Sequence, residues 1–267
     1  MDLINVFGKE WYYGMEAGRR VHPYHPNVVF TNDCVVKYNS ENGETVEFRT
    51  RKLDKPITTR HWDGKDYVSN YAVGGICSCD SYSYGTFSIK CKLPKGSGQH
   101  AAFWLSGDKT WPPEIDCFET CNTLKAKTMA WPDIFQIFKN GYATELLKWN
   151  SIMPARRIQP NIHWDTDKND KCTSAFNTPF NFFNNPYDEF NEYRILWMPD
   201  LIKIIYNGNP VMECRDESIL EWFNKSPLMH VILDNNYIQS VEDCKKDVKT
   251  GYTKTPFVVY GFEYRPL

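Results

Sequence analysis

Three acidic residues stand within six positions of one another in an otherwise apolar stretch of the chain. Residues 114 to 119 read Glu-Ile-Asp-Cys-Phe-Glu and follow directly after Trp111-Pro112-Pro113. Carboxylates are rarely buried without a partner or a purpose. A strand that lines up several of them therefore indicates either cation binding or proton transfer.

The spacing suits chemistry on one face of a strand. Glu114 and Asp116 point together because side chains alternate along a strand, and a β-bulge near Cys117-Phe118 would bring Glu119 to the same face. With Cα atoms roughly 13 Å apart, inclined glutamate carboxyls could approach to about 5–5.5 Å, the separation in a retaining glycosidase. Asp116 would lie between them and separate their pKa values through a hydrogen bond or a shared proton.

Two other interpretations of the acidic stretch are a calcium site and a solvated acidic strand edge. Calcium sites usually draw ligands from loops with backbone carbonyls and glycine turns, which a strand with apolar flanks matches poorly. We therefore favour catalysis, and we predict no metal.

The elements around the acidic stretch are predicted to be mostly strands. Residues 85–93 alternate strictly between apolar and polar side chains, which is typical of a strand with one wet face. Further strands are predicted at 100–105, 193–197, 201–206, 210–212, 229–233 and 257–264. Asn207-Gly208 predicts a tight hairpin turn, and residues 218–224 are the best short helix candidate.

Many short strands separated by Gly, Pro and Asn turns favour an all-β fold, an antiparallel β-sandwich. The 267 residues can form one large core, so we expect a single domain over 1–267. Residues 122–160 fit the strand pattern least well. We interpret them as a long loop excursion, which in a compact domain is usually functional.

Charge and composition limit the partners. The net charge of −2 gives no electrostatic case for nucleic acid or an anionic membrane, and no apolar run approaches the ~20 residues of a membrane span.

The nine cysteines are scattered along the chain, which favours free, mostly buried thiols. The N-terminus lacks a secretory signal pattern. If the substrate is extracellular, we expect either export with the signal removed or release by a phage or virus.

Several motifs occur in an order that resembles glycoside hydrolase family 16, which includes laminarinase-like and agarase/carrageenase-like enzymes. Residues 114–119 resemble the family's E-[aliphatic]-D-x-x-E signature. The other matching segments are Tyr84-Gly85-Thr86-Phe87, Lys92 to Gly96, Ala102-Phe103-Trp104-Leu105, Trp111-Pro112, Asn161-Ile162-His163-Trp164, and Phe190 to Gly208. The matches run from about residue 70 to 264, and the ordered set is more specific for fold than for activity.

The resemblance implies a jelly-roll sandwich of two curved antiparallel sheets with substrate in a concave cleft. Glu114 would be the nucleophile, Asp116 the auxiliary carboxylate, and Glu119 the general acid and then base of a retaining double displacement.

Aromatic and histidine side chains would complete the site. Trp111 and Trp104 would be sugar platforms or cleft walls, although Trp104 could equally be a core residue. His163 would contact substrate or Glu119, or be an ordinary strand histidine.

The sequence also departs from the family pattern. His100-Ala101 stands where many members have Trp-Pro, so that end of the cleft would differ. Gly74-Gly75-Ile76 lacks the Arg that often follows there. Tyr260 occupies the place of an Asp that helps many members to bind a structural calcium, so we expect neither calcium nor any cofactor.

The leading hypothesis is an endo-acting retaining β-glycosidase that hydrolyses a polysaccharide and works as a monomer. The first substrate guess is β-1,3- or β-1,3/1,4-glucan, and the second is a β-1,4-linked galactan of the agar or carrageenan type. The alternatives are a non-catalytic carbohydrate-binding or virion structural domain on the same fold, or a transglycosylase.

Overall fold

The computed structural model describes residues 2–21, 27–41, 43–61, 63–95, 98–120, 158–165, 186–225, 227–237 and 255–267. The predicted excursion at 122–160 lies almost entirely outside these residues, as do Cys121, Cys172 and Cys244. The other six cysteines are free, and five of them are buried, as predicted for those positions.

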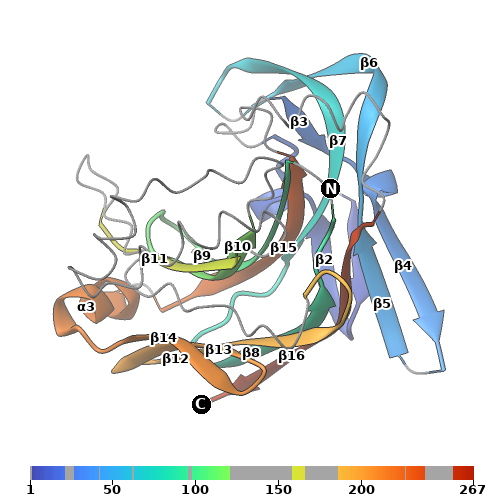
Figure 1. Cartoon of the computed structure of the whole chain (residues 1–267). Coiled ribbons are helices and arrows are strands. Elements are labelled where there is room, and N and C mark those ends of the chain that lie inside the picture. Colours follow the sequence, from blue (N-terminus) through green and yellow to red (C-terminus); the bar gives the residue numbers. More distant parts are fainter. Residues whose placement is uncertain are drawn as a thin grey trace, which may run out of the picture.

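Two sheets make up the fold of the described residues (Figure 1). The first contains nine strands: β1 (Leu3–Val6), β2 (Lys9–Tyr13), β3 (Val28–Phe30), β6 (Thr50–Arg60), β7 (Asp66–Ser78), β9 (Gln99–Gly107), β10 (Glu114–Thr120), β11 (Ile158–His163) and β15 (Met229–Tyr237). Its main path runs β1-β2-β7-β15-β9-β10-β11, and β3 and β6 pair with β7 beside that path.

The second sheet contains seven strands in the order β14-β13-β12-β8-β16-β5-β4. They are β14 (Asn209–Cys214), β13 (Leu201–Tyr206), β12 (Asn191–Met198), β8 (Gly85–Lys92), β16 (Phe257–Pro266), β5 (Gly43–Phe48) and β4 (Val35–Ser40). All strand pairs of the described residues are antiparallel except the short β3–β7 pair. The predicted antiparallel sandwich is therefore confirmed, and the sixteen strands and their order match a jelly roll.

Helical structure is short in the described residues: α3 (Glu217–Lys225) and the 3-10 turns η1 (Glu16–Gly18) and η2 (Asn32–Cys34). α3 matches the predicted helix within a residue at each end. None of these helices has the length and apolar character of a membrane span.

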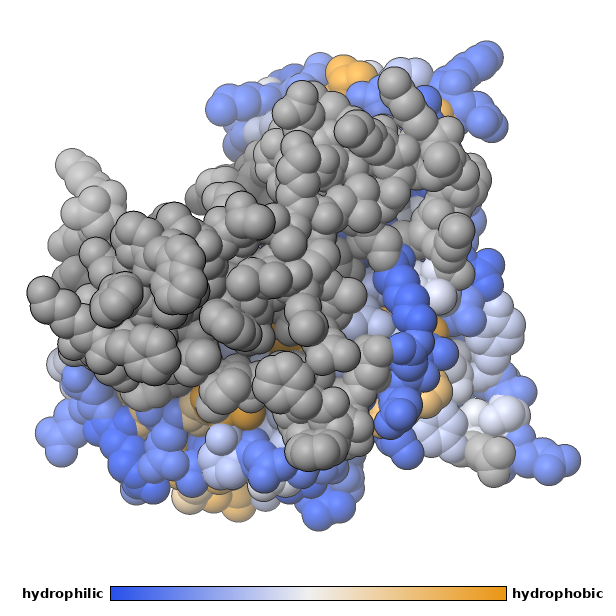
Figure 2. Space-filling model, viewed as in Figure 1, coloured by the Kyte–Doolittle hydropathy of each residue, from blue (hydrophilic) through white to orange (hydrophobic). Residues whose placement is uncertain are grey.

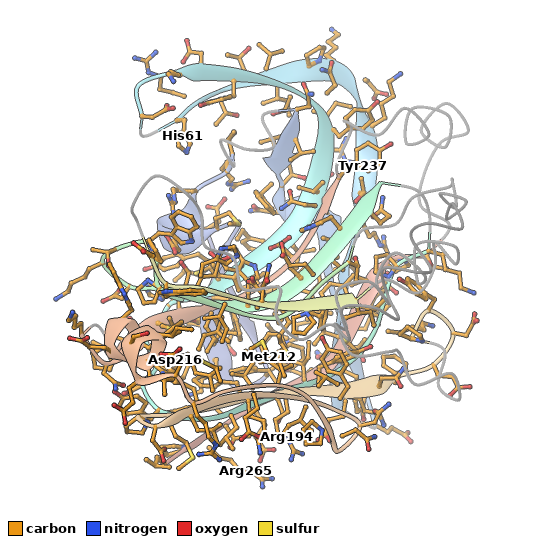
Figure 3. All side chains as sticks on the ribbon, turned by 60° about the vertical axis from the view of Figure 1, so that its left-hand side comes forward. His61, Arg194, Met212, Asp216, Tyr237 and Arg265 are labelled. Carbon is orange, nitrogen blue, oxygen red and sulfur yellow. The ribbon has the colours of Figure 1, made fainter. Side chains whose placement is uncertain are left out.

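The hydrophobic core lies between the two sheets. Alternate residues of β8, β9 and β12 point into it, including Phe87, Phe103 and Trp197, which are fully buried. For β8, alternation predicted the inward positions such as Phe87, and it also assigns the intervening residues to the outer face. The seven-stranded sheet turns Arg194 and Arg265 outward, away from the other sheet (Figure 3). There they pair with Glu192 and Glu263, and the visible edge of this layer is largely hydrophilic (Figure 2).

The nine-stranded sheet curves, and β6 and β7 rise from it as a long hairpin (Figure 1). A second apolar cluster covers part of its concave face: Met15, Val28, Phe30, Val73, Cys77, Ile232 and Tyr237. Gly75 makes this packing possible, because a Cβ atom there would lie 2.7 Å from the Phe30 ring. The rest of the concave face carries the acidic stretch.

The Asn207-Gly208 turn forms as predicted. Both residues have positive φ, 47° and 79°, which is the backbone that a two-residue hairpin turn requires and that Asn and Gly adopt most readily. The turn joins β13 to β14 and fixes their register, from Ile202 opposite Cys214 to Tyr206 opposite Asn209.

Candidate active site

The three carboxylates lie on β10, and the predicted bulge is present. Asp116 pairs with Trp104 on β9. Phe118 lies two residues further along β10 but pairs with Phe103, which is only one residue away from Trp104 on the antiparallel strand β9. Cys117 is therefore the extra residue, and the register against β11 shifts across the same segment. Such a bulge re-aims the side chains that follow it.

The bulge determines which side chains of β10 face the core and which face the concave side of the sheet. Ile115, Cys117 and Phe118 are fully buried in the core between the sheets. Glu114, Asp116 and Glu119 remain for the concave face, as the sequence predicted. The Cys117 carbonyl accepts a 2.7 Å hydrogen bond from the Tyr206 hydroxyl of the opposite sheet. This bond ties the bulge to the second layer.

Glu114 is surrounded by hydrogen-bond donors. The Trp111 indole N–H donates to its Oε2 at 2.5 Å, and His163 Nε2, opposite it on β11, lies 3.5 Å from its Oε1. Burial and then the charge of Asp116 raise the pKa of Glu114 well above its usual range, while His163 and the Trp111 hydrogen bond act in the opposite direction.

Asp116 is 1% exposed and shares a hydrogen bond with Glu114. Burial, followed by the charge of Glu119, raises the pKa of Asp116 well above its usual range. Its Oδ2 lies 3.3 Å from His163 Nε2. Two carboxyls that share a hydrogen bond in a buried place favour one shared proton over two negative charges.

Glu119 has a different environment. His100 Nε2, from β9, lies 3.4 Å from its Oε1. Burial would raise the pKa of Glu119, but the hydrogen bond and charge of His100, the charge of His163 and a hydrogen bond from Asn161 together lower it. One strand thus carries a proton-sharing carboxyl pair and a third carboxylate that is paired with a histidine.

Comparison with known proteins agrees with this geometry. The profile of Glycosyl hydrolases family 16 matches residues 26–235, which is most of the chain. The chain belongs to this family. The prediction made from the ordered motifs is therefore confirmed.

Solved structures of the family share its fold. LamAcat from Zobellia galactanivorans is 16% identical, with a TM-score of 0.61 over 93% of this chain and 88% of that chain. Porphyranase B from the same organism is 14% identical, with a TM-score of 0.64 over 95% and 84%. The laminarinase catalytic domain from Thermotoga maritima is 17% identical, with a TM-score of 0.61 over 97% and 90%.

One curated relative matches over a short segment. Endo-1,3-1,4-beta-glycanase EglC of Rhizobium meliloti is 40% identical over 60 residues, which are 21% of this chain and 12% of that protein. The match is close but covers only a small part of either protein.

The two predicted tryptophans of this family 16 chain have different surroundings. Trp111 is 44% exposed, and its ring lies 5.9 Å from that of His163. It precedes β10 in a loop that starts at Gly107, where a Cβ would lie 2.4 Å from the Thr110 carbonyl oxygen. Trp104 is half-buried, packs against the second apolar cluster and donates its N–H to Asp234 at 2.9 Å. It therefore belongs to the concave face and not to the core between the sheets.

His163 lies on the same face. The resemblance suggested a contact with Glu119, but His163 instead lies beside Glu114 and Asp116. It stands opposite Glu114 and within 3.5 Å of both Glu114 and Asp116. The same three side chains offer ligand atoms within 4.8 Å of one another, a spacing that would also suit a small cation. Calcium takes six to eight oxygens, and this set offers two carboxylates and an imidazole. The hydrogen bonds of Glu114 agree better with proton transfer.

Sequence reasoning did not assign roles to three neighbours of the carboxylates. His100, Asn161 and Asp234 all lie on strands beside β10 or β9. Period-two counting from Trp104 would have placed His100 on the concave face. Its contact with Glu119 depends on the bulge, which shifts the register between β9 and β10.

Proposed function

We propose that this chain is an endo-acting, retaining β-glycosidase that cleaves a polysaccharide by double displacement. The observation that carries the proposal is the bulged strand β10, with three carboxylates on the concave face of the sheet. Family membership supports the reaction class. We also propose that the chain is a single catalytic domain that works as a monomer.

In the first step, Glu114 attacks the anomeric carbon and Glu119 protonates the departing oxygen, which forms a glycosyl ester on Glu114. In the second step, Glu119 removes a proton from water, and the water oxygen displaces Glu114. The anomeric carbon inverts twice, so its configuration is retained.

Glu114 must be ionised to attack, although burial raises its pKa. We propose that the proton shared with Asp116 resides on Asp116 when substrate is bound. The Trp111 N–H and His163 favour charge on Glu114, whereas Glu119 and Asp234 oppose charge on Asp116. Asp116 thus acts as an auxiliary carboxyl that keeps the nucleophile ionised.

Substrate contacts would come from the exposed Trp111 ring, which can stack on a sugar face, and from Trp104 and His163 on the wall of the concave face. The substrate proposal is β-1,3- or β-1,3/1,4-glucan, with agar- or carrageenan-type galactan as the second choice. Relatives named for a 1,3-1,4-β-glycanase, a laminarinase and a porphyranase cover both classes.

A panel of these polysaccharides tests the proposal through the release of new reducing ends. We expect rapid loss of chain length with few monosaccharides, which is the pattern of an endo-acting enzyme. Binding without new reducing ends would instead indicate a carbohydrate-binding or structural domain. Products longer than the substrate would identify a transglycosylase.

Glu119→Ala tests the role of the general acid and base. Removing it should lower the rate on polysaccharide by about 10²–10⁴. On a glycoside with an activated leaving group, added azide should restore turnover and give the β-glycosyl azide. No recovery, or an α-azide, would reject the assignment of Glu119.

A further inference from the structure

His100 is the histidine that faces Glu119. It lies on the same face of β9 as Trp104, and its Nε2 is 3.4 Å from Glu119 Oε1. The His100 side chain is 14% exposed and therefore largely shielded from water, whereas that of Glu119 is 34% exposed and partly open to the concave face. Nothing in the double displacement described above requires a histidine at this place.

The surroundings of the pair are rich in carboxylates. Among the described residues, the titratable groups that face it are Asp116 on β10, Asp234 on β15 and His163 on β11. Burial opposes a charge on His100, but the hydrogen bond and charge of Glu119 and the charge of Asp234 raise the pKa of His100. The contact between the two side chains therefore favours an imidazolium beside a carboxylate.

This charge distribution conflicts with the first chemical step. A general acid must carry a proton on its carboxyl group when the glycosidic bond breaks. Beside a protonated His100, Glu119 gives up its carboxyl proton more readily, because the hydrogen bond and charge of His100 lower the pKa of Glu119. The proton that it needs is one hydrogen bond away, on His100.

We propose that His100 is a positioning residue that stores the proton which Glu119 delivers to the leaving oxygen. The inference rests on the proposed function and goes beyond it by making the acid a two-residue unit. It follows from the contact of His100 Nε2 with Glu119 Oε1 in a shielded place among carboxylates.

The proton balance closes over one turnover. Before cleavage, the proton moves from His100 Nε2 to Glu119, which leaves a neutral imidazole and a carboxylic acid. Glu119 then gives the proton to the glycosidic oxygen as the bond to the anomeric carbon breaks. In the second step Glu119 takes a proton from water, and transfer to His100 restores the starting pair.

The pH dependence of kcat/KM tests this unit. When two sites share one proton, that proton is lost with an apparent pKa that belongs to the pair. This apparent pKa is at least as high as the pKa of either site measured with its partner deprotonated. His100→Gln keeps a neutral hydrogen-bond donor but leaves only the carboxyl to hold the proton. The alkaline limb of the profile should therefore move to lower pH by about one unit or more. An unmoved alkaline limb in the folded variant would overturn the proposal.

His230→Gln is the matched control. His230, on β15, is also paired with a carboxylate, Asp108, at 2.8 Å, but it has no contact with the three carboxylates of β10. The alkaline limb of kcat/KM for His230→Gln should coincide with that of the unmodified protein. Thermal melts of both variants show whether they fold, and a shift of equal size in His230→Gln would also reject a specific role for His100.

A titration by NMR gives a second test that needs neither the His100 variant nor activity. The imidazole nitrogens of His100 are followed in the unmodified protein and in Glu119→Gln. The pKa of His100 should fall by about one unit or more when the carboxylate is removed. An unchanged pKa would overturn the shared proton. A coupled titration in a protein that cleaves no polysaccharide would instead reject the proposed function and leave the pair intact.

Discussion

Glu114 and Glu119 stand on one strand but have different neighbours. Glu114 accepts a hydrogen bond from Trp111 and shares another with Asp116, whereas Glu119 is paired with His100. Taken alone, the resulting pKa directions would make Glu114 the proton donor and Glu119 the nucleophile. In our proposals, a proton on Asp116 and a proton stored on His100 reconcile these directions with the roles that the family signature implies.

Trp111→Phe isolates the indole hydrogen bond, because phenylalanine keeps an aromatic face for a sugar. That bond lowers the pKa of Glu114, so its loss should raise the pKa of this proposed nucleophile. Since Glu114 must be ionised to attack, the acid limb of kcat/KM should move to higher pH. At a pH below the limb, kcat/KM should fall about tenfold for every pH unit by which the limb moves.

Trp104→Phe is the control for this change, because its indole N–H goes to Asp234 and not to Glu114. Its acid limb should stay where it is in the unmodified protein. An acid limb that moves equally in both variants, or in neither, would contradict a specific effect of Trp111 on Glu114.

At the scale of elements, the bulge in β10 decides which residues can act together. Cys117 is the extra residue, and its carbonyl is held by the Tyr206 hydroxyl from β13 in the other sheet. Without the bulge, Glu119 would face the core and not the concave side. The orientation of Glu119 therefore depends on the bulge, which a hydrogen bond joins to the other sheet.

Tyr206→Phe removes that hydrogen bond and leaves a buried carbonyl without its partner. We expect a loss of about 1–3 kcal/mol in the free energy of unfolding. Because small misplacements of reacting groups are costly, kcat should also fall by about tenfold or more. Chemical denaturation and steady-state kinetics measure the two effects.

Tyr264→Phe provides the comparison. The Tyr264 hydroxyl also donates to a backbone carbonyl at 3.1 Å, but this carbonyl is that of Tyr84 and does not belong to β10. It should lose stability without a change in kcat. Equal changes of kcat in the two variants would show that the Tyr206 bond has no special link to the site.

Local patterns predicted much of this architecture. Alternation in 85–93 gave the faces of β8, and Asn207-Gly208 gave the β13–β14 hairpin. The requirement that Glu119 share a face with Glu114 gave the bulge. Each of these inferences uses residues close together in the sequence.

The partners across strands could not be predicted in the same way. Tyr206 is 89 residues from Cys117, and Asp234 is 130 residues from Trp104. Such contacts depend on strand order and register, which single-strand patterns do not contain. His100 was recognised only as a departure from the family motif, because its contact with Glu119 requires the shifted register.

For the molecule as a whole, a buried carboxyl group on the concave face lowers the stability of the fold. Asp234 is 2% exposed on that face and accepts hydrogen bonds from Trp104 and Asn236. Burial raises its pKa from 3.8 to about 6. The folded state thus binds a proton more tightly than the unfolded state, so this group destabilises the fold as pH rises from about 4 through 6.

Asp234→Asn removes this titration. The free energy of unfolding of the variant minus that of the unmodified protein should increase by about 2 kcal/mol as the pH rises from 4.5 to 7.5. Hydrogen bonds lost by the substitution cancel in this comparison between two pH values. Urea unfolding at both values measures it, and a difference between the proteins that does not vary with pH would contradict a raised pKa at Asp234.

The central claim is that β10 carries a retaining catalytic unit with Glu114 as nucleophile and Glu119 as acid and base. Proton NMR of the first products from a soluble β-1,3-glucan oligosaccharide, or from whichever panel substrate is cleaved, tests it most directly. We predict that the β-anomer appears first and that the α-anomer grows in only by mutarotation. An α-anomer formed first would contradict double displacement on this strand.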